Sequence, residues 1–394
     1  MIYVGIDVAS DKHDFCIVRD TGESLSSGRI ANSRDGYEKL LGAIGKAKER
    51  SKDDKVRIGL ESTGPYSLAI CDYLRKRFPD LVLINPTLTH KFMESETLHY
   101  AKTDAADAAG ICRFLASRKF KAYAGVSYHT TQIRSLYRCL TDINRQLNML
   151  KNRLLQMVRT AFPEYLSKKE TLGDLDFRFL AAFPTPQAIL ASTPKKMTGK
   201  MRKQPYLRFT EKTAERITGL AKNTGGTESR YTDFEIRFAA EHILFLEEQK
   251  SEIKEKLGEL LREEYSYMLD IPDAGTVTVA GIVGEIGNIE NFRSPDSIVA
   301  YAGLDPFVYE SGKYKADKAV IMKHGSSYLR NALVTLARSM YMHGEPTVKE
   351  FVDRKRKEGK KYNCAINHAA RKLCRLIFHK LKSREAFDPG KWKA

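Results

Sequence analysis

The segment IYVGIDV, residues 2–8, is an apolar, β-branched run that is typical of a buried strand. The alternating run FCIV, residues 15–18, follows the polar residues 10–12 and predicts an antiparallel hairpin partner for it. Asp7 lies near the end of the first strand. Because an unpaired carboxylate is costly in an apolar setting, Asp7 is expected to have a partner or to bind a ligand.

Further acids follow at the ends of the next predicted elements. The run VRIGLE, residues 56–61, predicts a strand that ends at Glu61, and it is followed by a helical pattern over 66–77 and a strand over 81–86. The stretch KTDAADA, residues 102–108, predicts a helix start with Thr103 or Asp104 as N-cap. Asp104 and Asp107 are three residues apart and therefore share one helix face.

Four carboxylates that converge from two strands and a helix suit Mg²⁺ or Mn²⁺, and such ions assist cleavage of phosphodiesters. Taken singly, each acid also fits an ordinary structural role. Asp104 fits a helix cap, Asp107 a solvated first-turn acid, and Asp7 and Glu61 polar strand ends. Taken together, their order along the chain is that of a ribonuclease-H-like nuclease core. We therefore predict an α/β RNase H-like N-terminal domain.

Several motifs carry a resemblance to a known family. GID (5–7), LESTG (60–64), INP (84–86) and KTDAADA (102–108) resemble the RuvC-like domain of the DEDD transposases of bacterial insertion sequences, the bridge-RNA-guided serine recombinases to which Piv-like invertases are related. YAGLDP (301–306), ESG (310–312), KHG (323–325) and LR (329–330) resemble the second, serine-bearing domain of that family. The resemblance spans nearly the whole chain and is least specific over residues 166–231.

This resemblance implies a site-specific recombinase whose chemistry combines metal-binding acids with a serine nucleophile. Asp7, Glu61, Asp104 and Asp107 would be catalytic and bind Mg²⁺ or Mn²⁺, and Ser311 would be the nucleophile that forms a covalent phosphoserine link to DNA. The implied partners are double-stranded donor and target DNA, a structured guide RNA, and further copies of the chain in a dimer or tetramer on nucleic acid. By itself, a Ser-Gly pair in a lysine-rich segment is typical of a turn.

The period of the apolar pattern changes in the middle of the chain and divides it into three predicted parts. We predict a RuvC-like domain over 1–127, coiled-coil helices over 128–265 with a helical insertion at about 166–231, and a mainly α-helical serine-bearing domain over 266–394. The two heptad seams are Ile133, Leu136, Leu140, Ile143, Leu147, Leu150, Leu154 and Met157, and then Ile236, Ala239, Ile243, Leu246, Lys250, Ile253, Leu257 and Leu260. The seams fit pairing within one chain or with a second chain, and the family resemblance favours assembly of protomers.

The charge of the chain indicates a polyanionic partner. The net charge is +17, and residues 341–394 hold 15 basic and 6 acidic residues. The turn Pro272-Asp273-Ala274-Gly275 resembles that of a helix-hairpin-helix, although Asp273 stands where a glycine is usual, and a plain structural hairpin remains the alternative. The expected nucleic-acid-binding residues are Lys102, Gly275, Lys313, Lys315, Lys323 and Arg330.

Other functional classes fit less well. Six cysteines without a Cys-x-x-Cys pair do not favour a zinc site or a disulfide framework, and the lack of an 18-residue apolar run predicts a cytoplasmic protein without a membrane partner. A sugar-kinase-like ATPase would need a glycine and a hydroxyl residue after Asp7, where Val8 and Ala9 stand. A Holliday-junction-resolvase-like nuclease, which needs only the four acids and water, and a DNA invertase of the same family remain the alternatives.

Overall fold

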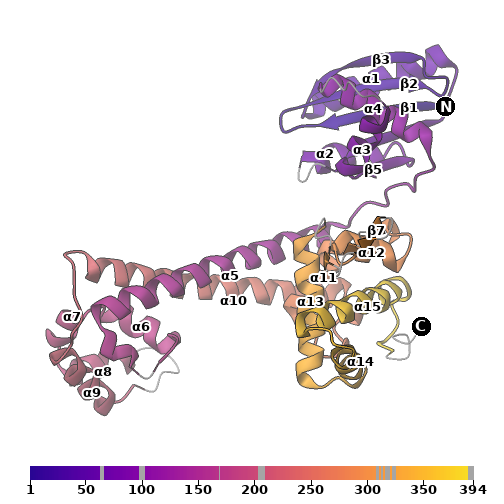
Figure 1. Ribbon diagram of the computed structural model, residues 1–394. Helices are drawn as coiled ribbons and strands as arrows, with labels where there is room; N and C mark the ends of the chain where they lie inside the picture. Colours follow the sequence, from indigo (N-terminus) through magenta and orange to yellow (C-terminus); the bar gives the residue numbers. More distant parts are fainter. Residues whose placement is uncertain are drawn as a thin grey trace. The chain divides into compact units, whose positions relative to one another are not determined.

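The computed structural model of the chain consists of two compact units, Met1–Ser127 with Asn288–Arg293, and Tyr128–Gly287 with Ser294–Ala394 (Figure 1). The structure describes residues 1–62, 66–96, 103–167, 169–202, 209–307, 310–311, 314–315, 320–321 and 325–388, and over 306–321 it describes the backbone only.

The first unit is built on a mixed five-stranded sheet of order β3-β2-β1-β4-β5. β1, β2 and β3 are antiparallel, and β4 and β5 run parallel to β1. The predicted strands and hairpin are confirmed, but β3 had not been predicted because its sequence, SLSSGRIA, is polar and forms a sheet edge. The strands are β1 (Ile2–Val8), β2 (Lys12–Arg19), β3 (Ser24–Ala31), β4 (Val56–Glu61) and β5 (Leu81–Ile84).

Helices cover both faces of this sheet. The side chains of β1 alternate between the faces, as a strand requires: Ile2, Val4, Ile6 and Val8 join the core formed with α1 and α2, and Tyr3 packs toward α4 on the other face. Gly5 and Asp7 therefore lie on the α4 face. The helices are α1 (Arg34–Ser51), α2 (Tyr66–Arg75), α3 (Pro86–Glu96) and α4 (Asp104–Ser117).

A pair of glycines lets α4 approach the sheet closely. Gly5 and Gly59 are register partners on the parallel strands β1 and β4. A Cβ at Gly5 would collide with the backbone oxygen of Ala108, and a Cβ at Gly59 would collide with the side chain of Leu115. The absence of a side chain at both positions thus fixes the depth at which α4 packs.

The second unit is organised around two long helices, α5 (Tyr128–Ala161) and α10 (Thr232–Glu264), which lie side by side within the chain (Figure 1). Most predicted seam residues are buried, but six are only half-buried: Leu136, Leu150, Met157, Lys250, Ile253 and Leu260. Tyr137, Val158 and Leu261, which each follow one of these six, are buried. At the far ends of the seams the buried row moves to Val158 and Leu261 because a straight helix with 3.6 residues per turn drifts away from a heptad repeat. Tyr137 is instead buried against α11 (Thr276–Ile286), where a Cβ at Gly281 would collide with its ring. Lys250, the polar seam position, pairs with Glu247 at 3.0 Å, and Glu247 also pairs with Lys151 of α5 at 2.6 Å.

The segment between the long helices is helical, as expected for the insertion. Its helices pack with the adjoining ends of α5 and α10 around a core that includes Phe162, Phe179 and Ile236. The elements are η1 (Pro163–Leu166), α6 (Asp174–Ala182), α7 (Pro186–Leu190), α8 (Pro194–Arg202) and α9 (Glu211–Lys222).

The remainder of the second unit is mainly helical. Buried Glu285 of α11 accepts two hydrogen bonds from Arg138 of α5 at 2.7 and 3.0 Å and one from Ser326 at 2.8 Å, which links three segments. The elements are η2 (Ser266–Met268), α11 (Thr276–Ile286), α12 (Pro295–Ala302), β6 (Pro306–Phe307), β7 (Glu310–Ser311), β8 (Tyr314–Lys315), β9 (Val320–Ile321), α13 (Ser327–His343), α14 (Pro346–Lys357) and α15 (Tyr362–Ser383).

Residues 288–293, which contain η3 (Ile289–Asn291), belong to the first unit. Asn291 accepts a hydrogen bond from the backbone of Ala124 at 2.8 Å, and Glu290 pairs with Lys121 at 3.6 Å. Across the described part of the chain, no helix combines the length and the apolar character needed to span a bilayer.

Candidate active site

A row of charged side chains crosses the α4 face of the first unit's sheet. In the register of the strands, Arg29 of β3 lies beside Asp14 of β2, and Asp14 lies beside Asp7 of β1. Glu61 follows Leu60, the register partner of Ile6, and so continues the row on β4. Neighbouring residues in register share a face, so the row is a direct consequence of strand pairing.

Helix α4 adds two more acids above this row. Asp104 is its first residue, and Asp107 lies one turn on, next to the buried Ala108 that packs over Gly5. Thr103 is the N-cap, since its hydroxyl accepts a hydrogen bond from the backbone N–H of Ala106 at 3.2 Å, which confirms one of the two predicted caps. Close packing on Gly5 thus places the start of α4 near Asp7.

The electrostatics show that the predicted acids act on one another. Burial raises the pKa of Asp7 to about 6, and the negative charges of Glu61, Asp107, Asp104 and Asp14 contribute in that order. Burial also raises the pKa of Asp107, an effect that the nearby His90 opposes. Within the described residues, the Asp7 carboxylate makes no hydrogen bond or ion pair. The cluster therefore concentrates negative charge that a cation would neutralise.

Sequence reasoning had missed several residues around the acids. Arg29 Nε donates to both oxygens of Asp14 at 3.1 and 3.0 Å, and Arg29 Nη2 lies 3.4 Å from Asp104 Oδ2. Lys12 lies 4.0 Å from the same Asp104 oxygen, and the buried hydroxyl of Thr89 donates to Glu61. Only the pairing of β2 with β3 brings Arg29 next to the acids, so the local sequence around Asp7 does not predict its role.

The donor set fits a hard divalent cation in its chemistry, because carboxylate oxygens are the ligands that Mg²⁺ and Mn²⁺ prefer. In its present arrangement the cluster is not closed: the described residues include no group of three or more acidic, histidine or cysteine side chains positioned to hold a metal ion. Asp104 is instead directed to Arg29 and Lys12. Binding a metal would thus require Asp104 to exchange these cationic partners.

The other predicted site residues lie in the second unit or outside the described residues. Ser311 lies on β7, where it is the register partner of Tyr314, and Lys315 lies on β8. Lys102, Lys313 and Lys323 lie outside the described residues. Arg330 donates a hydrogen bond to the backbone oxygen of Ala302 at 2.8 Å, so part of its guanidinium has a structural role.

The predicted helix-hairpin-helix-like segment forms a turn between η2 and α11. Gly275 is the N-cap of α11, and open space lies where its Cβ would stand, so an incoming group can approach the helix start. Asp273 has a left-handed backbone with φ of 57° and pairs with His343 at 3.1 Å, and Asp270 pairs with Lys380 at 2.7 Å. The two acids of the turn therefore have partners inside the unit.

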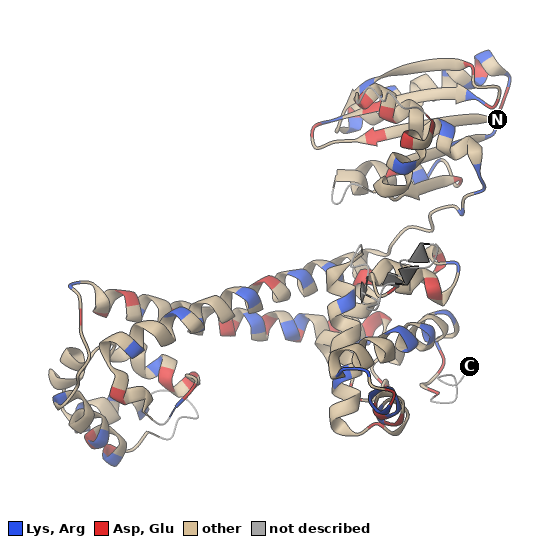
Figure 2. Cartoon of the chain, viewed as in Figure 1, with Lys and Arg blue, Asp and Glu red and all other residues tan. Residues whose placement is uncertain are grey.

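Basic side chains gather at the end of α14 and on the segment that follows it (Figure 2). The last turn of α14 holds Arg354, Lys355, Arg356 and Lys357, and Lys360 and Lys361 continue the series. On α15, burial lowers the pKa of Lys372, and the positive charges of Arg354 and Arg375 contribute. We call the basic residues from Arg354 to Lys361 the α14 basic surface. Because their positive charges repel one another, they favour an anionic partner.

The fold and the charged row are accompanied by matches to two protein-family models. Residues 4–163 match a transposase model of the DEDD type of IS110, and residues 265–353 match a model described as "Transposase IS116/IS110/IS902 family". These matches define the class: the chain is a DNA transposase or recombinase. More particularly, it belongs to the IS110/IS116/IS902 family of transposases.

Curated relatives are similar over nearly their full length. The chain is 22% identical to the mini-circle transposase for IS117 of Streptomyces coelicolor, over 98% of this chain and 95% of the relative. It is 21% identical to a pilin gene-inverting protein of Moraxella bovis, over 98% and 97%. It is also 22% identical to the 44.8 kDa protein of insertion element IS116 from Streptomyces clavuligerus, over 99% and 96%.

Proposed function

We propose that this transposase cuts and rejoins DNA at specific sites, using the acids of its first unit and Ser311 of its second unit, under the guidance of a structured RNA. The observation that carries the proposal is the gathering of Glu61, Asp107 and Asp104 around Asp7: burial raises the pKa of Asp7 to about 6, and the negative charges of these acids add to the rise. Acids gathered in this way are typical of a metal-dependent phosphodiester site. The RNase H-like order of strands and helices supports the same interpretation.

In the proposed mechanism, Asp7, Glu61, Asp104 and Asp107 hold Mg²⁺ or Mn²⁺. When bound, such an ion supplies charge neutralisation at the scissile phosphate. The pairing of Asp14 with Arg29 joins β2 to β3, and the buried hydroxyl of Thr89 orients Glu61 through its hydrogen bond. The Thr89 contact limits the movement of one of the proposed ligands before substrate arrives.

Ser311 has the role of nucleophile. Its hydroxyl oxygen forms a bond to the phosphorus and loses its proton, the bond from phosphorus to a deoxyribose oxygen breaks, and the departing oxygen takes up a proton. Rejoining reverses the step, with a deoxyribose hydroxyl of another strand attacking the phosphoserine. The balance of bonds is therefore conserved, and no external energy source is needed.

The nucleic acid itself would be held by phosphate contacts. The α14 basic surface and the open turn at Gly275 offer positive charge and free backbone N–H groups. Lys102, Lys313, Lys315 and Lys323 are further proposed contacts, and helices α5 and α10 are proposed to support assembly of protomers on donor and target DNA. If base pairing with RNA selects the sites, the protein needs only shape and backbone contacts.

The acids are tested by amide variants. Asp7→Asn, Glu61→Gln, Asp104→Asn and Asp107→Asn should each abolish recombination in Mg²⁺ while leaving folding and nucleic-acid binding intact. Asp35→Asn is the matched control, because Asp35 is also a first-turn helix acid of this unit and is exposed. Full activity of Asp104→Asn would refute the assignment.

The serine is tested by trapping a covalent protein–DNA adduct on a nicked substrate that cannot be rejoined. The adduct should form with the wild-type protein and be absent in Ser311→Ala, with exposed Ser135→Ala on α5 as the control. Cleavage that persists in Ser311→Ala without any adduct would favour a resolvase-like nuclease, which uses water as nucleophile.

A DNA invertase is the second candidate function, since one relative is named a pilin gene-inverting protein. The two activities differ in their products on a plasmid: inversion of a segment between two sites, or excision and insertion of an element. The guide is tested by sequencing the RNA that co-purifies with the protein. Lack of enrichment of any RNA encoded beside its own gene would contradict RNA guidance.

A further inference from the structure

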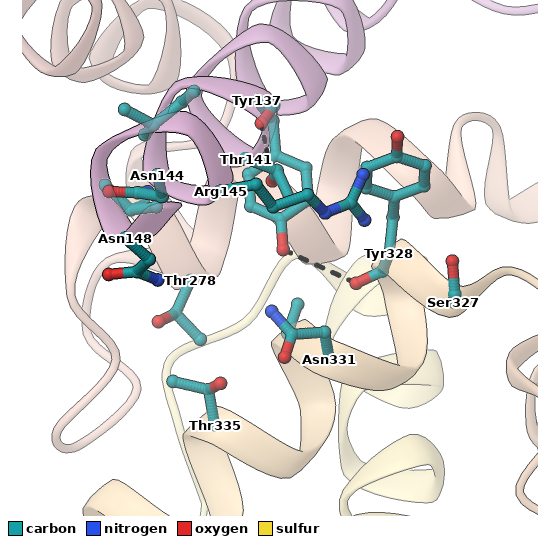
Figure 3. A pocket seen from close by; sticks show the side chains of 13 residues that line it. Tyr137, Thr141, Asn144, Arg145, Asn148, Thr278, Ser327, Tyr328, Asn331 and Thr335 are labelled. Carbon is teal, nitrogen blue, oxygen red and sulfur yellow. Dashed lines mark hydrogen bonds between the residues drawn. The ribbon is translucent and has the colours of Figure 1, made fainter. Parts of the chain in front are cut away.

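A polar cavity of about 460 Å³ lies within the second unit, between α5, the start of α11, and α13 (Figure 3). Its volume falls in the roughly 300–1,000 Å³ range of small-ligand sites. Uncharged hydrogen-bonding side chains dominate its wall: Thr141, Asn144, Asn148, Thr278, Asn331 and Thr335. None of the predicted catalytic residues lines it, so it is separate from the site described above.

Most of these polar groups are available to a ligand. The side chains of Asn144, Asn148, Thr278 and Thr335 make no hydrogen bond to another described residue. In Figure 3 the amides of α5 and the side chains of α13 project from opposite sides of the cavity. Each asparagine amide offers a donor pair and an acceptor, which matches the edge of a nucleobase.

The cavity also has an aromatic surface and a positive charge. Arg145 lies over the ring of Tyr328 at 5.6 Å, and Arg138 lies over the same ring at 4.9 Å. Arg145 is the charged residue of the wall and pairs with Asp142 at 2.9 Å, an exposed pair that a phosphate can replace. None of the described residues that line the cavity is acidic. A planar base can stack on such a surface while its phosphate meets the guanidinium.

The floor of the cavity is held rigidly. The buried hydroxyl of Tyr137 donates to the backbone oxygen of Tyr328 at 3.4 Å, and Thr141 donates to the backbone oxygen of Tyr137 at 2.9 Å. The bidentate pair of Arg138 with buried Glu285 fixes α5 against α11. The helices that form the cavity are therefore fixed against one another before a ligand binds, which lowers the entropic cost of binding.

We propose that this cavity binds one unpaired nucleotide of a nucleic-acid strand, with the base between Tyr328 and the amides of Asn144 and Asn148 and the phosphate at Arg145. The inference rests on the proposed function, because it assigns an unpaired nucleotide to the transposase's own nucleic-acid partner. Duplex stems engage phosphate-binding surfaces such as the α14 basic surface, whereas a bulged or looped nucleotide enters the cavity.

The test compares three ligands of equal length by fluorescence anisotropy with the full-length protein: a paired duplex, the same duplex with one bulged nucleotide, and a single strand, each as DNA and as RNA. The double variant Asn144→Ala/Asn148→Ala should bind the bulged ligand at least about tenfold more weakly, the effect of removing an amide–base hydrogen-bond pair, and bind the paired duplex as before. Asn152→Ala, an exposed amide one turn further along α5, is the matched control and should change neither.

Alanine favours helix more than asparagine does, so the variants should remain folded, and circular dichroism checks this. If the double variant loses affinity equally for the bulged and the paired ligand, or for neither, nucleotide binding in the cavity is refuted, while the proposed function still stands. Equilibrium dialysis with the four ribonucleoside 5′-monophosphates separates the remaining cases. If the wild-type protein binds a mononucleotide, the double variant does not, and neither binds an oligonucleotide, the nucleotide site stands and the proposed function is refuted. If no nucleotide or oligonucleotide binds, both proposals are refuted.

Discussion

Asp7 lies directly opposite Asp14 in the antiparallel register of β1 and β2, on the sheet face that α4 covers. Two carboxylates in this relation repel each other, and the fold neutralises only one of them: Arg29 donates to both oxygens of Asp14. Burial raises the pKa of Asp7 to about 6, and the negative charges of Glu61, Asp107 and Asp104 add to this rise. The site therefore stores an electrostatic cost that binding of a cation would relieve.

The first prediction concerns stability and pH without metal. Since the pKa of Asp7 is raised from 3.8 to about 6, the folded protein binds more protons than the unfolded chain in this window, and the free energy of unfolding falls as pH rises through it. Asp7→Asn should therefore raise the Tm of the first unit at pH 7–8, by about 2–4 °C for each kcal/mol gained, and the gain should vanish below about pH 4. Calorimetry in EDTA measures it, and a gain that is the same at every pH would contradict the stated cause.

The second prediction concerns divalent cations. Mg²⁺ or Mn²⁺ should raise the Tm of the wild-type first unit, with a stabilisation of about 2.7 kcal/mol at a hundredfold excess over Kd. Asp7→Asn and Asp107→Asn should reduce this response because each removes a ligand, while Asp35→Asn should retain it. Thermal scans at constant ionic strength with Na⁺ as reference provide the measurement, and an unchanged response in Asp7→Asn would argue against a metal at this position.

The third prediction tests the close approach of α4. Gly5→Ala should destabilise the first unit by about 1–3 kcal/mol or more, the usual cost of overpacking, because the new Cβ meets the Ala108 backbone. Gly42→Ala on α1 is the control: open space surrounds it, so alanine should stabilise by about 0.5–1 kcal/mol. Urea unfolding measures both, and a neutral Gly5→Ala would show that α4 can move away.

The fourth prediction concerns the ion pair between the exposed side chain of Arg138 and the fully buried Glu285 of the second unit. Arg138→Leu leaves the fully buried Glu285 without its bidentate partner and should cost about 3–5 kcal/mol. Arg237→Leu removes an exposed pair with Asp233 and should cost less than about 1 kcal/mol. The double variant Arg138→Leu/Glu285→Leu should recover part of the loss, and equal costs for the two single arginine variants would refute a buried role.

The fifth prediction concerns phosphate binding. Affinity for duplex DNA should fall by about 10³–10⁵ between 50 and 200 mM salt if roughly six to ten phosphates are bound by basic side chains. Lys360→Ala/Lys361→Ala should reduce the slope of log affinity against log salt by about 2, one for each lysine that no longer binds a phosphate. Lys256→Ala, whose lysine pairs with Glu252 on α10, should leave the slope unchanged. An unaltered slope in the double variant would place the phosphate-binding side chains elsewhere.

Local patterns predicted much of the first unit. The alternation of β1 and the β-branched runs of β4 and β5 are properties of short segments, and Thr103 as N-cap depends on its neighbours alone. β3 was missed because its polar sequence gains its hydrogen bonds only from β2. The heptad seams predicted two long helices but left open whether these pair within one chain or with a second chain, and only the structure pairs α5 with α10. The seams did not predict the burial of Tyr137, which depends on contact with α11, or of Leu261, where helical drift has accumulated over several turns.

The sequence by itself determined the chemical types at the site: acids at strand ends and at a helix start, a serine far along the chain, and an excess of basic residues. Only the tertiary structure decided that Arg29 neutralises Asp14 and not Asp7, that Gly5 and Gly59 lie side by side beneath α4, and that amides of α5 and α13 face one cavity. The physical reason is that residue type and period are local properties, whereas the pKa of a carboxyl group or the lining of a cavity depends on groups that only strand register and helix packing bring together.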